Sequence, residues 1–210
     1  MQTAKPNGKI SSELLTQRSI LSNESRLVKL APILISGTLL GILGFATYLY
    51  VHLGGYKEAS LLTEDLGPYK IIFIHHVGPY HKILESIAPV EKWAKENQLD
   101  CHESFGEYLD DPEVVIEDRL QSNGGCILSA EPNNLPATFS YREIPRKYYL
   151  TAEFDGAPSI GPFKVYPKAM KWIHEHHFNL GGPVIEIYTS TGTGGDARVH
   201  TKYLFPLGKL

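Results

Sequence analysis

Residues 78–108 read GPYHKILESIAPVEKWAKENQLDCHESFGEY, and residues 161–188 read GPFKVYPKAMKWIHEHHFNLGGPVIEIY. Each stretch places a Gly-Pro-aromatic triplet before a Lys-Trp pair and a later glutamate. The tryptophan precedes the glutamate by 14 positions in both, from Trp93 to Glu107 and from Trp172 to Glu186. Because an internal repeat identifies the unit of a fold, the two copies predict two similar units related by a pseudo-two-fold axis, with a shared cleft between them.

The hydrophobic pattern around the repeat predicts a strand, a helix and two further strands in each copy. Runs of β-branched and aromatic residues indicate the strands, and apolar residues at helical spacing indicate the helices. Pro89 predicts a kink or a helix start, and Pro167 is expected in a first turn. The expected strands are Tyr69–His76, Ser104–Leu109, Cys126–Ala130, Tyr148–Phe154, Val184–Thr189 and Val199–Phe205. This is an α+β fold of two βαββ repeats, with both helices on one face of a mostly antiparallel sheet.

A long apolar run precedes the repeat. Leu30 to Val51 is 22 residues without a charge, about 33 Å as a helix and enough to cross the hydrocarbon of a bilayer. Tyr48 and Tyr50 lie at its end, where interfacial aromatic residues are common. The chain is therefore expected to divide into a disordered polar segment (1–29), a transmembrane anchor in the lipid bilayer (30–52), a stalk (53–65) and a folded domain (66–210).

Charge separates at the anchor. Residues 1–59 carry a net charge of +3 and residues 60–210 a net charge of −6. An acidic domain argues against nucleic-acid binding, which needs a basic face against phosphates. Close to the apolar run, Lys and Arg are more frequent before it than after it: Lys5, Lys9, Arg18, Arg26 and Lys29 precede it, and Lys57 and Lys70 follow it. This bias predicts a cytoplasmic N-terminus with the domain on the far side of the membrane.

Cys101 and Cys126 are the two cysteines of the chain. They lie at or beside two neighbouring expected strands. A disulfide between them would suit a domain outside the cytosol, and two small buried thiols are the other interpretation. The sequence favours neither, because the geometry that a disulfide requires cannot be read from it.

Glu186 is the strongest candidate for a functional side chain. Side chains alternate between the two faces of a strand, so Ile185 and Ile187 are expected under the helices. Glu186 and Tyr188 then share the opposite face. An ionised carboxylate is costly to bury without a partner, so a simply solvated face, or a pairing with Lys or Arg, is the alternative interpretation.

Further residues are expected around the same groove. Glu107 occupies the matching position of the first copy, and Tyr80, Phe163 and Tyr188 are candidate walls. A glutamate among aromatic rings suits an amphipathic, cationic ligand, through charge pairing and cation–π contacts. We therefore predict a ligand-binding set of Glu186, Tyr188, Tyr80, Phe163 and Glu107.

Other chemistries lack a pattern in this chain. Nine histidines are present, but their spacing with carboxylates and cysteines matches no zinc motif. The STGTGGDA stretch (190–197) lacks the Gly-Lys-Ser/Thr of a phosphate loop, and no serine has the context of a nucleophile elbow. We expect no metal site and no cofactor.

Three groups of motifs resemble one family. HHVGPYHKI…KW, FGEYLDDP and YLTAEFDG…IGPF…KW…GGPVIEIY are similar to the GyrI-like small-molecule-binding domain, over roughly residues 66–206. That domain is also the effector-binding half of some multidrug-sensing transcription activators. The resemblance implies two βαββ units with a groove at their pseudo-two-fold axis, and a ligand that meets Glu186 and Tyr188. It also allows a hydrolase, since a few family members open strained rings. One branch joins the domain to a single N-terminal membrane anchor and includes reticulophagy receptors of the endoplasmic reticulum.

Three functions remain in competition. The first is a membrane-tethered module that binds a small amphipathic, cationic molecule in the groove. The second is a groove hydrolase with Glu186 as general base and Tyr188 as hydrogen-bond donor. The third is a membrane-tethered adaptor for a protein partner, similar to the reticulophagy receptors. We rank the enzyme below the binding module because the sequence offers no second strong catalytic group.

Overall fold

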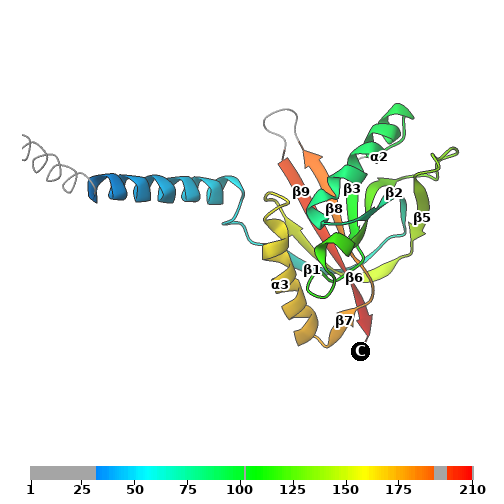
Figure 1. The fold of residues 1–210 in the computed structure, drawn as a ribbon. Coiled ribbons are helices and arrows are strands. Elements are labelled where there is room, and N and C mark those ends of the chain that lie inside the picture. Colours follow the sequence, from blue (N-terminus) through cyan, green and yellow to red (C-terminus); the bar gives the residue numbers. More distant parts are fainter. Residues whose placement is uncertain (1–31, 102, 192–197, 210) are drawn as a thin grey trace, which may run out of the picture. The chain divides into compact units, whose positions relative to one another are not determined.

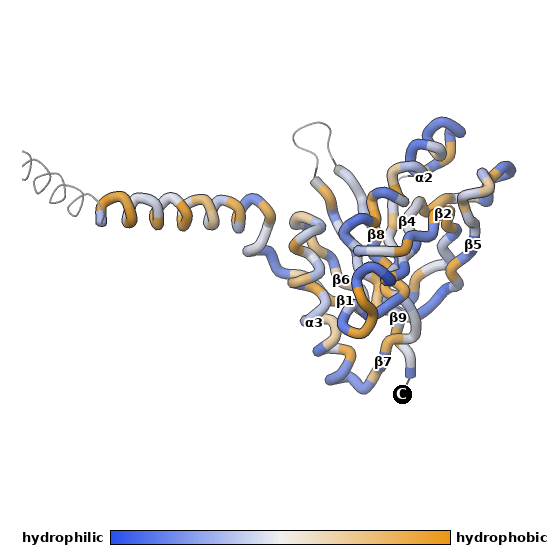
Figure 2. The backbone as a smooth tube through the Cα atoms, in the orientation of Figure 1, coloured by the Kyte–Doolittle hydropathy of each residue, from blue (hydrophilic) through white to orange (hydrophobic). Residues whose placement is uncertain are grey.

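A computed structural model describes residues 32–101, 103–191 and 198–209. The chain forms two compact units, divided between His52 and Leu53. The first contains the helix Pro32–His52, whose 21 residues and mean hydropathy of 1.7 make it long and apolar enough to cross a membrane. Figure 2 colours most of this helix orange to pale, the hydrophobic and intermediate part of the hydropathy scale. An apolar N-terminal helix is therefore present where the sequence predicts one.

The second unit is built on a sheet of nine antiparallel strands (Figure 1). The strands are β1 (Ser60–Leu66), β2 (Tyr69–Val77), β3 (Glu103–Tyr108), β4 (Gln121–Leu128), β5 (Ser140–Ile144), β6 (Lys147–Phe154), β7 (Phe178–Leu180), β8 (Val184–Thr191) and β9 (Arg198–Lys209). Their order is β1-β6-β9-β8-β3-β4-β2-β5, with β7 paired to β9. All six expected strands are present, which confirms the α+β class, and β1, β5 and β7 are additional.

Both long helices of this unit cover the same face of the sheet. α2 (Leu84–Glu96) buries Val90 and Ala94 beside Ile72 of β2, and α3 (Gly161–Glu175) buries Val165 beside Phe154 of β6. One row of laterally paired residues joins these two strands, namely Ile72, Cys126, Ser104, Tyr188, Thr201 and Phe154. Residues in such a row point to one side, so the expected placement of the helices is confirmed.

The prolines sit differently from the prediction. Pro89 lies inside α2, so the helix does not start there. Pro167 is also interior, the seventh residue of α3 and not in its first turn. The first turn contains Pro162 instead. A backbone N–H at that position would have no intrahelical partner, so a proline there costs the helix no hydrogen bond.

The opposite face of the sheet has an apolar core of its own. Ile185 and Ile187 lie there with Tyr149 and Ile144. β5 ends the strand order on one side and β6 lies second from the other end, yet Ile144 and Tyr149 share this core. The sheet therefore curls, and this is its inner face. The expectation that Ile185 and Ile187 lie under the helices is wrong, because the curled sheet buries its second face without help from a helix.

The stalk expected over residues 53–65 is part of the folded unit. β1 pairs with β6 along its length, and the Ala157 N–H donates to the Leu53 carbonyl at 3.0 Å. Lys168 of α3 donates from its Nζ to the Ala59 carbonyl at 2.7 Å. The prediction failed because this segment is polar and has a weak apolar pattern, and the strand is stabilised by pairing with distant β6.

Cys101 and Cys126 form a disulfide, with their Cα atoms 5.5 Å apart. The bond joins the segment after α2 to β4, where Cys126 is fully buried. The structure thus decides between the two interpretations that the sequence leaves open.

Candidate functional site

Glu186 is buried in the first half of β8, on the face that the helices cover. It is 5% exposed, and each carboxylate oxygen accepts one tyrosine hydroxyl. Tyr166 of α3 donates to Oε1 at 3.0 Å, and Tyr188 donates to Oε2 at 3.0 Å. Burial raises the pKa of Glu186 to about 7, although the two tyrosine hydrogen bonds oppose that rise by favouring the charged form. The carboxylate can therefore take up or release a proton near neutral pH.

Tyr108 of β3 extends this arrangement into a chain of hydroxyl groups. Its oxygen lies 2.8 Å from the Tyr188 oxygen. Since Tyr188 donates its own proton to Glu186, its oxygen accepts the proton of Tyr108. Burial, followed by the charge of Glu186, raises the pKa of Tyr108, Tyr166 and Tyr188 well above the usual value. These tyrosines are therefore hydrogen-bond donors at neutral pH, and they hold the carboxylate in place.

Gly106 leaves room for the Tyr108 hydroxyl in this chain of hydroxyl groups. It pairs laterally with Glu186 across β3 and β8, so the two residues share a face. A Cβ at position 106 would lie 3.0 Å from the Tyr108 hydroxyl oxygen, closer than an ordinary contact. The absence of a side chain here lets Tyr108 lie beside the glutamate.

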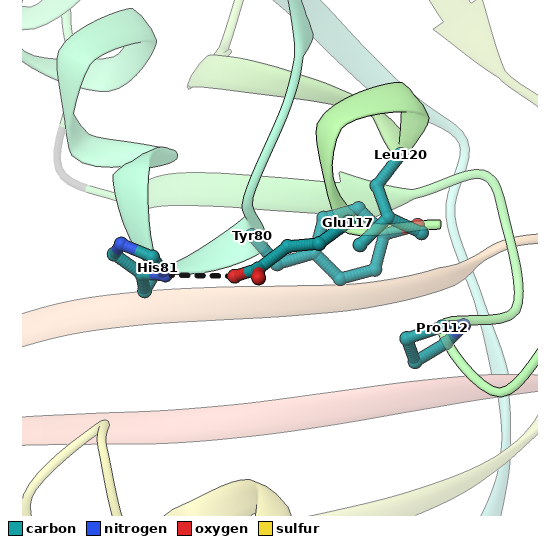
Figure 3. Close-up of a pocket in the computed structure, with 5 residues that line it drawn as sticks. All are labelled: Tyr80, His81, Pro112, Glu117 and Leu120. Carbon is teal, nitrogen blue, oxygen red and sulfur yellow. Dashed lines mark ion pairs between the residues drawn. The ribbon is translucent and has the colours of Figure 1, made fainter. Parts of the chain in front are cut away.

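Tyr80 connects this cluster to a surface hollow. Its ring meets the ring of Tyr108 edge to face, with centroids 4.7 Å apart. Its hydroxyl donates to the Asp110 carbonyl at 2.8 Å and accepts the Asp110 N–H at 3.0 Å. The hollow, of about 350 Å³, is lined by Tyr80, His81, Pro112, Glu117 and Leu120 (Figure 3). Tyr80 therefore lies between the hollow and the half-buried tyrosines around Glu186.

Phe163 is not brought to the carboxylate. It occupies the first turn of α3 and is 80% exposed, whereas Glu186 is buried. Tyr166, about one helical turn later, is the α3 residue that reaches Glu186. Helical spacing of apolar residues indicates the helix that contains Tyr166, but it does not indicate that the Tyr166 hydroxyl reaches a carboxylate.

Glu107 lies on the opposite face from Glu186. It pairs laterally with Ile185, so it points into the inner face of the sheet. Its carboxylate accepts the Asn123 side-chain N–H at 2.7 Å and forms an ion pair with Arg142. The expectation that Glu107 and Glu186 share one groove is therefore wrong. Equal spacing from a tryptophan does not conserve the face, because a register shift of one residue exchanges the two faces of a strand.

An alignment of the two copies by sheet register, rather than by their tryptophans, identifies Tyr108. Gly106-Glu107-Tyr108 matches Glu186-Ile187-Tyr188 when Gly106 is aligned with Glu186, as the sheet register pairs them. In that alignment Tyr108 matches Tyr188, and their hydroxyls touch.

Within the described residues, no group of three His, Cys, Asp or Glu could hold a metal ion.

Comparison with known proteins places this geometry in a family. The model of the GyrI-like small molecule binding domain matches residues 63–207. A DNA gyrase inhibitor of Pectobacterium carotovorum is 29% identical over 93 residues, which are 43% of this chain and 60% of that protein. The chain thus matches less than two thirds of that relative.

Solved structures show the same fold. EcmrR in a complex with DNA has a TM-score of 0.61 at 15% identity, covering 99% of this chain and 90% of its own. The C-terminal domain of EcmrR has a TM-score of 0.58 at 17% identity, covering 73% of this chain and 98% of its own. On the match over residues 63–207, the chain belongs to the GyrI-like small molecule binding domain family.

Proposed function

We propose that this protein is a membrane-anchored module that binds a small amphipathic cation at Glu186. The observation that carries the proposal is a buried carboxylate whose two oxygens each accept a tyrosine hydroxyl. A carboxylate in this setting is poorly solvated, so an incoming cation gains more from it than from an exposed glutamate. The surrounding rings add cation–π attraction and exclude water.

The strand order supports a groove at a pseudo-two-fold axis. Between β6 and β2 the order is β6-β9-β8-β3-β4-β2. These are the first, third and second strands of the second βαββ repeat, followed by the second, third and first strands of the first repeat. The centre of this palindrome is the β3–β8 pair, where Gly106 faces Glu186 and Tyr108 meets Tyr188. The ligand would therefore bind where the two βαββ repeats of the folded unit meet, between α2 and α3.

The binding proposal is tested with the full chain in lipid nanodiscs and benzyltrimethylammonium as the probe. We expect calorimetric binding that weakens at least tenfold in Glu186→Gln. The matched control is Glu143→Gln, which removes an exposed carboxylate from β5 and should leave binding unchanged. Because a bound cation ionises Glu186, binding at pH 7 should also release about half a proton. Equal affinity of Glu186→Gln and the parent would reject the proposal.

A hydrolase is the second candidate. A carboxyl with a pKa of about 7 can act as a general base near neutral pH, and Tyr188 is positioned to donate a hydrogen bond. Ligands that bind in the first experiment would be incubated with the protein and analysed by mass spectrometry. Product formation that is lost in Glu186→Gln, with binding retained, would favour the enzyme.

We further propose a single-pass membrane protein with a cytoplasmic N-terminus and the folded unit on the far side of the membrane. The single N-terminal anchor is the feature that it would share with the membrane-anchored branch of the family. The apolar helix Pro32–His52, the charge bias and the disulfide Cys101–Cys126 support this topology. Protease treatment of sealed vesicles tests it. Protection of the folded unit, together with a disulfide that persists in cell extracts quenched with an alkylating reagent, is expected.

A membrane-tethered adaptor, similar to reticulophagy receptors, remains the alternative for the whole protein. It would require a protein partner of residues 1–29 or of an exposed apolar surface. Retention of such a partner by the Glu186→Gln variant would separate this role from ligand binding.

A further inference from the structure

The hollow in Figure 3 is formed by two connections that are far apart in the chain. The 3-10 turn η1 (Tyr80–Lys82) supplies Tyr80 and His81, and the β3–β4 connection supplies Pro112, Glu117 and Leu120. The lining combines the Tyr80 ring, the His81 imidazole, two apolar side chains and the exposed Glu117 carboxylate. Figure 3 shows the Glu117 carboxylate directed toward the His81 ring. Glu117 Oε1 lies 3.6 Å from His81 Nδ1.

The walls of the hollow are fixed by hydrogen bonds rather than by loose packing. The Gly78 N–H donates to the Leu120 carbonyl at 2.8 Å, and the Gln121 N–H donates to Asp110 Oδ2 at 2.7 Å. The Tyr80 hydroxyl is held by Asp110 from both its donor and its acceptor side. A hollow that is already formed costs little conformational entropy when a ligand enters.

We propose that this hollow is an outer subsite that takes the apolar part of a small aromatic or alkyl ammonium ion. This rests on the proposed function, because the subsite serves the same class of ligand as Glu186. Tyr80 presents its ring to the hollow and touches Tyr108, the first hydroxyl of the chain that ends at Glu186. Tyr80 is therefore the wall that the outer subsite shares with the buried one.

The chemistry of the lining selects the ligand. Leu120 is 3% exposed and forms an apolar floor, and the Tyr80 ring can receive a cation or an apolar group. Glu117 is 67% exposed and adds a negative charge at the rim. A volume of about 350 Å³ is at the small end of ligand pockets, so a phenyl-sized group fits better than a large polycyclic drug.

The test uses the full chain in lipid nanodiscs and two cations, tetramethylammonium and benzyltrimethylammonium. Pro112→Trp fills the hollow, and Val114→Trp is the matched control, because Val114 lies in the same connection but is 79% exposed and does not line the hollow. We expect Pro112→Trp to weaken benzyltrimethylammonium about tenfold and tetramethylammonium much less. Val114→Trp should leave both affinities unchanged.

A second measurement protects the test against a folding defect in Pro112→Trp. A trimethylammonium probe with a photoreactive diazirine on its apolar arm is cross-linked to the parent protein. We expect adducts in residues 80–82 and 112–120. Adducts elsewhere, or equal affinities of Pro112→Trp and Val114→Trp for benzyltrimethylammonium, would overturn the outer subsite.

The outcomes separate this proposal from the one on which it rests. If Glu186→Gln abolishes binding while Pro112→Trp does not, the site at Glu186 stands and the outer subsite is rejected. If Pro112→Trp weakens binding while Glu186→Gln does not, the hollow is a binding site of its own and the proposed role of Glu186 is rejected. If the parent protein binds neither cation, both proposals are rejected.

Discussion

Glu107 and Glu186 lie on adjacent strands, and both are buried, but their carboxylates have different partners on opposite faces of the sheet. Glu107 points into the inner face of the sheet, where Arg142 and Asn123 satisfy its carboxylate. Glu186 points to the helix face, where Tyr166 and Tyr188 donate to it, and no cation of the described residues is among its hydrogen-bond partners. The charge of Glu107 is compensated within the fold by a cationic partner. The Glu186 carboxylate is held by neutral hydroxyl donors, which is why we propose it as the partner of a cationic ligand.

The largest expected difference is in the pH dependence of stability. The pKa of Glu186 is raised from 4.5 to about 7, so the folded state binds more protons than the unfolded state between these values. Its contribution to stability is therefore full below about pH 4.5 and is lost as pH rises through about 7. We expect a decrease of up to about 3 kcal/mol across this window. Urea unfolding at a series of pH values measures it, and a slope that persists in Glu186→Gln would contradict the assignment.

The second difference is the cost of removing each carboxylate charge. Glu107→Ala leaves Arg142 without its partner and Asn123 without its acceptor, and should destabilise the fold by about 2 kcal/mol. Arg142 is 39% exposed, and water limits this cost. Glu186→Gln should change stability at pH 7 by less than about 1 kcal/mol, since the amide oxygen can still accept a tyrosine hydroxyl. Urea midpoints of both variants at pH 7 test the order, and a larger loss in Glu186→Gln would reverse the comparison.

The third and smallest effect concerns the tyrosine donors. Tyr188→Phe removes the hydrogen bond to Oε2 and the acceptor of Tyr108. Because that hydrogen bond lowers the pKa of Glu186, its loss should raise this pKa further. Stability at pH 7 should fall by about 1 kcal/mol. Carboxyl carbon NMR follows the titration. Tyr149→Phe, on the inner face, is the matched control, and an identical titration in Tyr188→Phe would show that the hydroxyl does not act on Glu186.

The strands and helices were predictable where the local pattern was strong. All six expected strands exist, and the two helices lie on one face, because alternating and helical periods are written in consecutive residues. β1, β5 and β7 were missed because they are polar or short and depend on pairing with distant strands. The assumed stalk became part of the domain for the same reason.

The site was predictable only in part. The sequence indicates Glu186 and Tyr188 on one face of β8, and the structure places both there. It does not indicate Tyr108 and Tyr166, since these reach the carboxylate from another strand and from α3. It places Glu107 in the same groove, and the sheet register places it on the other face.

The sequence by itself determined the α+β class, the apolar N-terminal helix and the membership of Glu186 and Tyr188 in one strand face. These follow from residue order and periodicity, which are local properties. Only the tertiary structure decided which face the helices cover, which tyrosines surround the carboxylate and that Cys101 bonds to Cys126. Those features depend on sheet register and curvature, where a shift of one residue moves a side chain to the opposite face, and no local pattern specifies that shift.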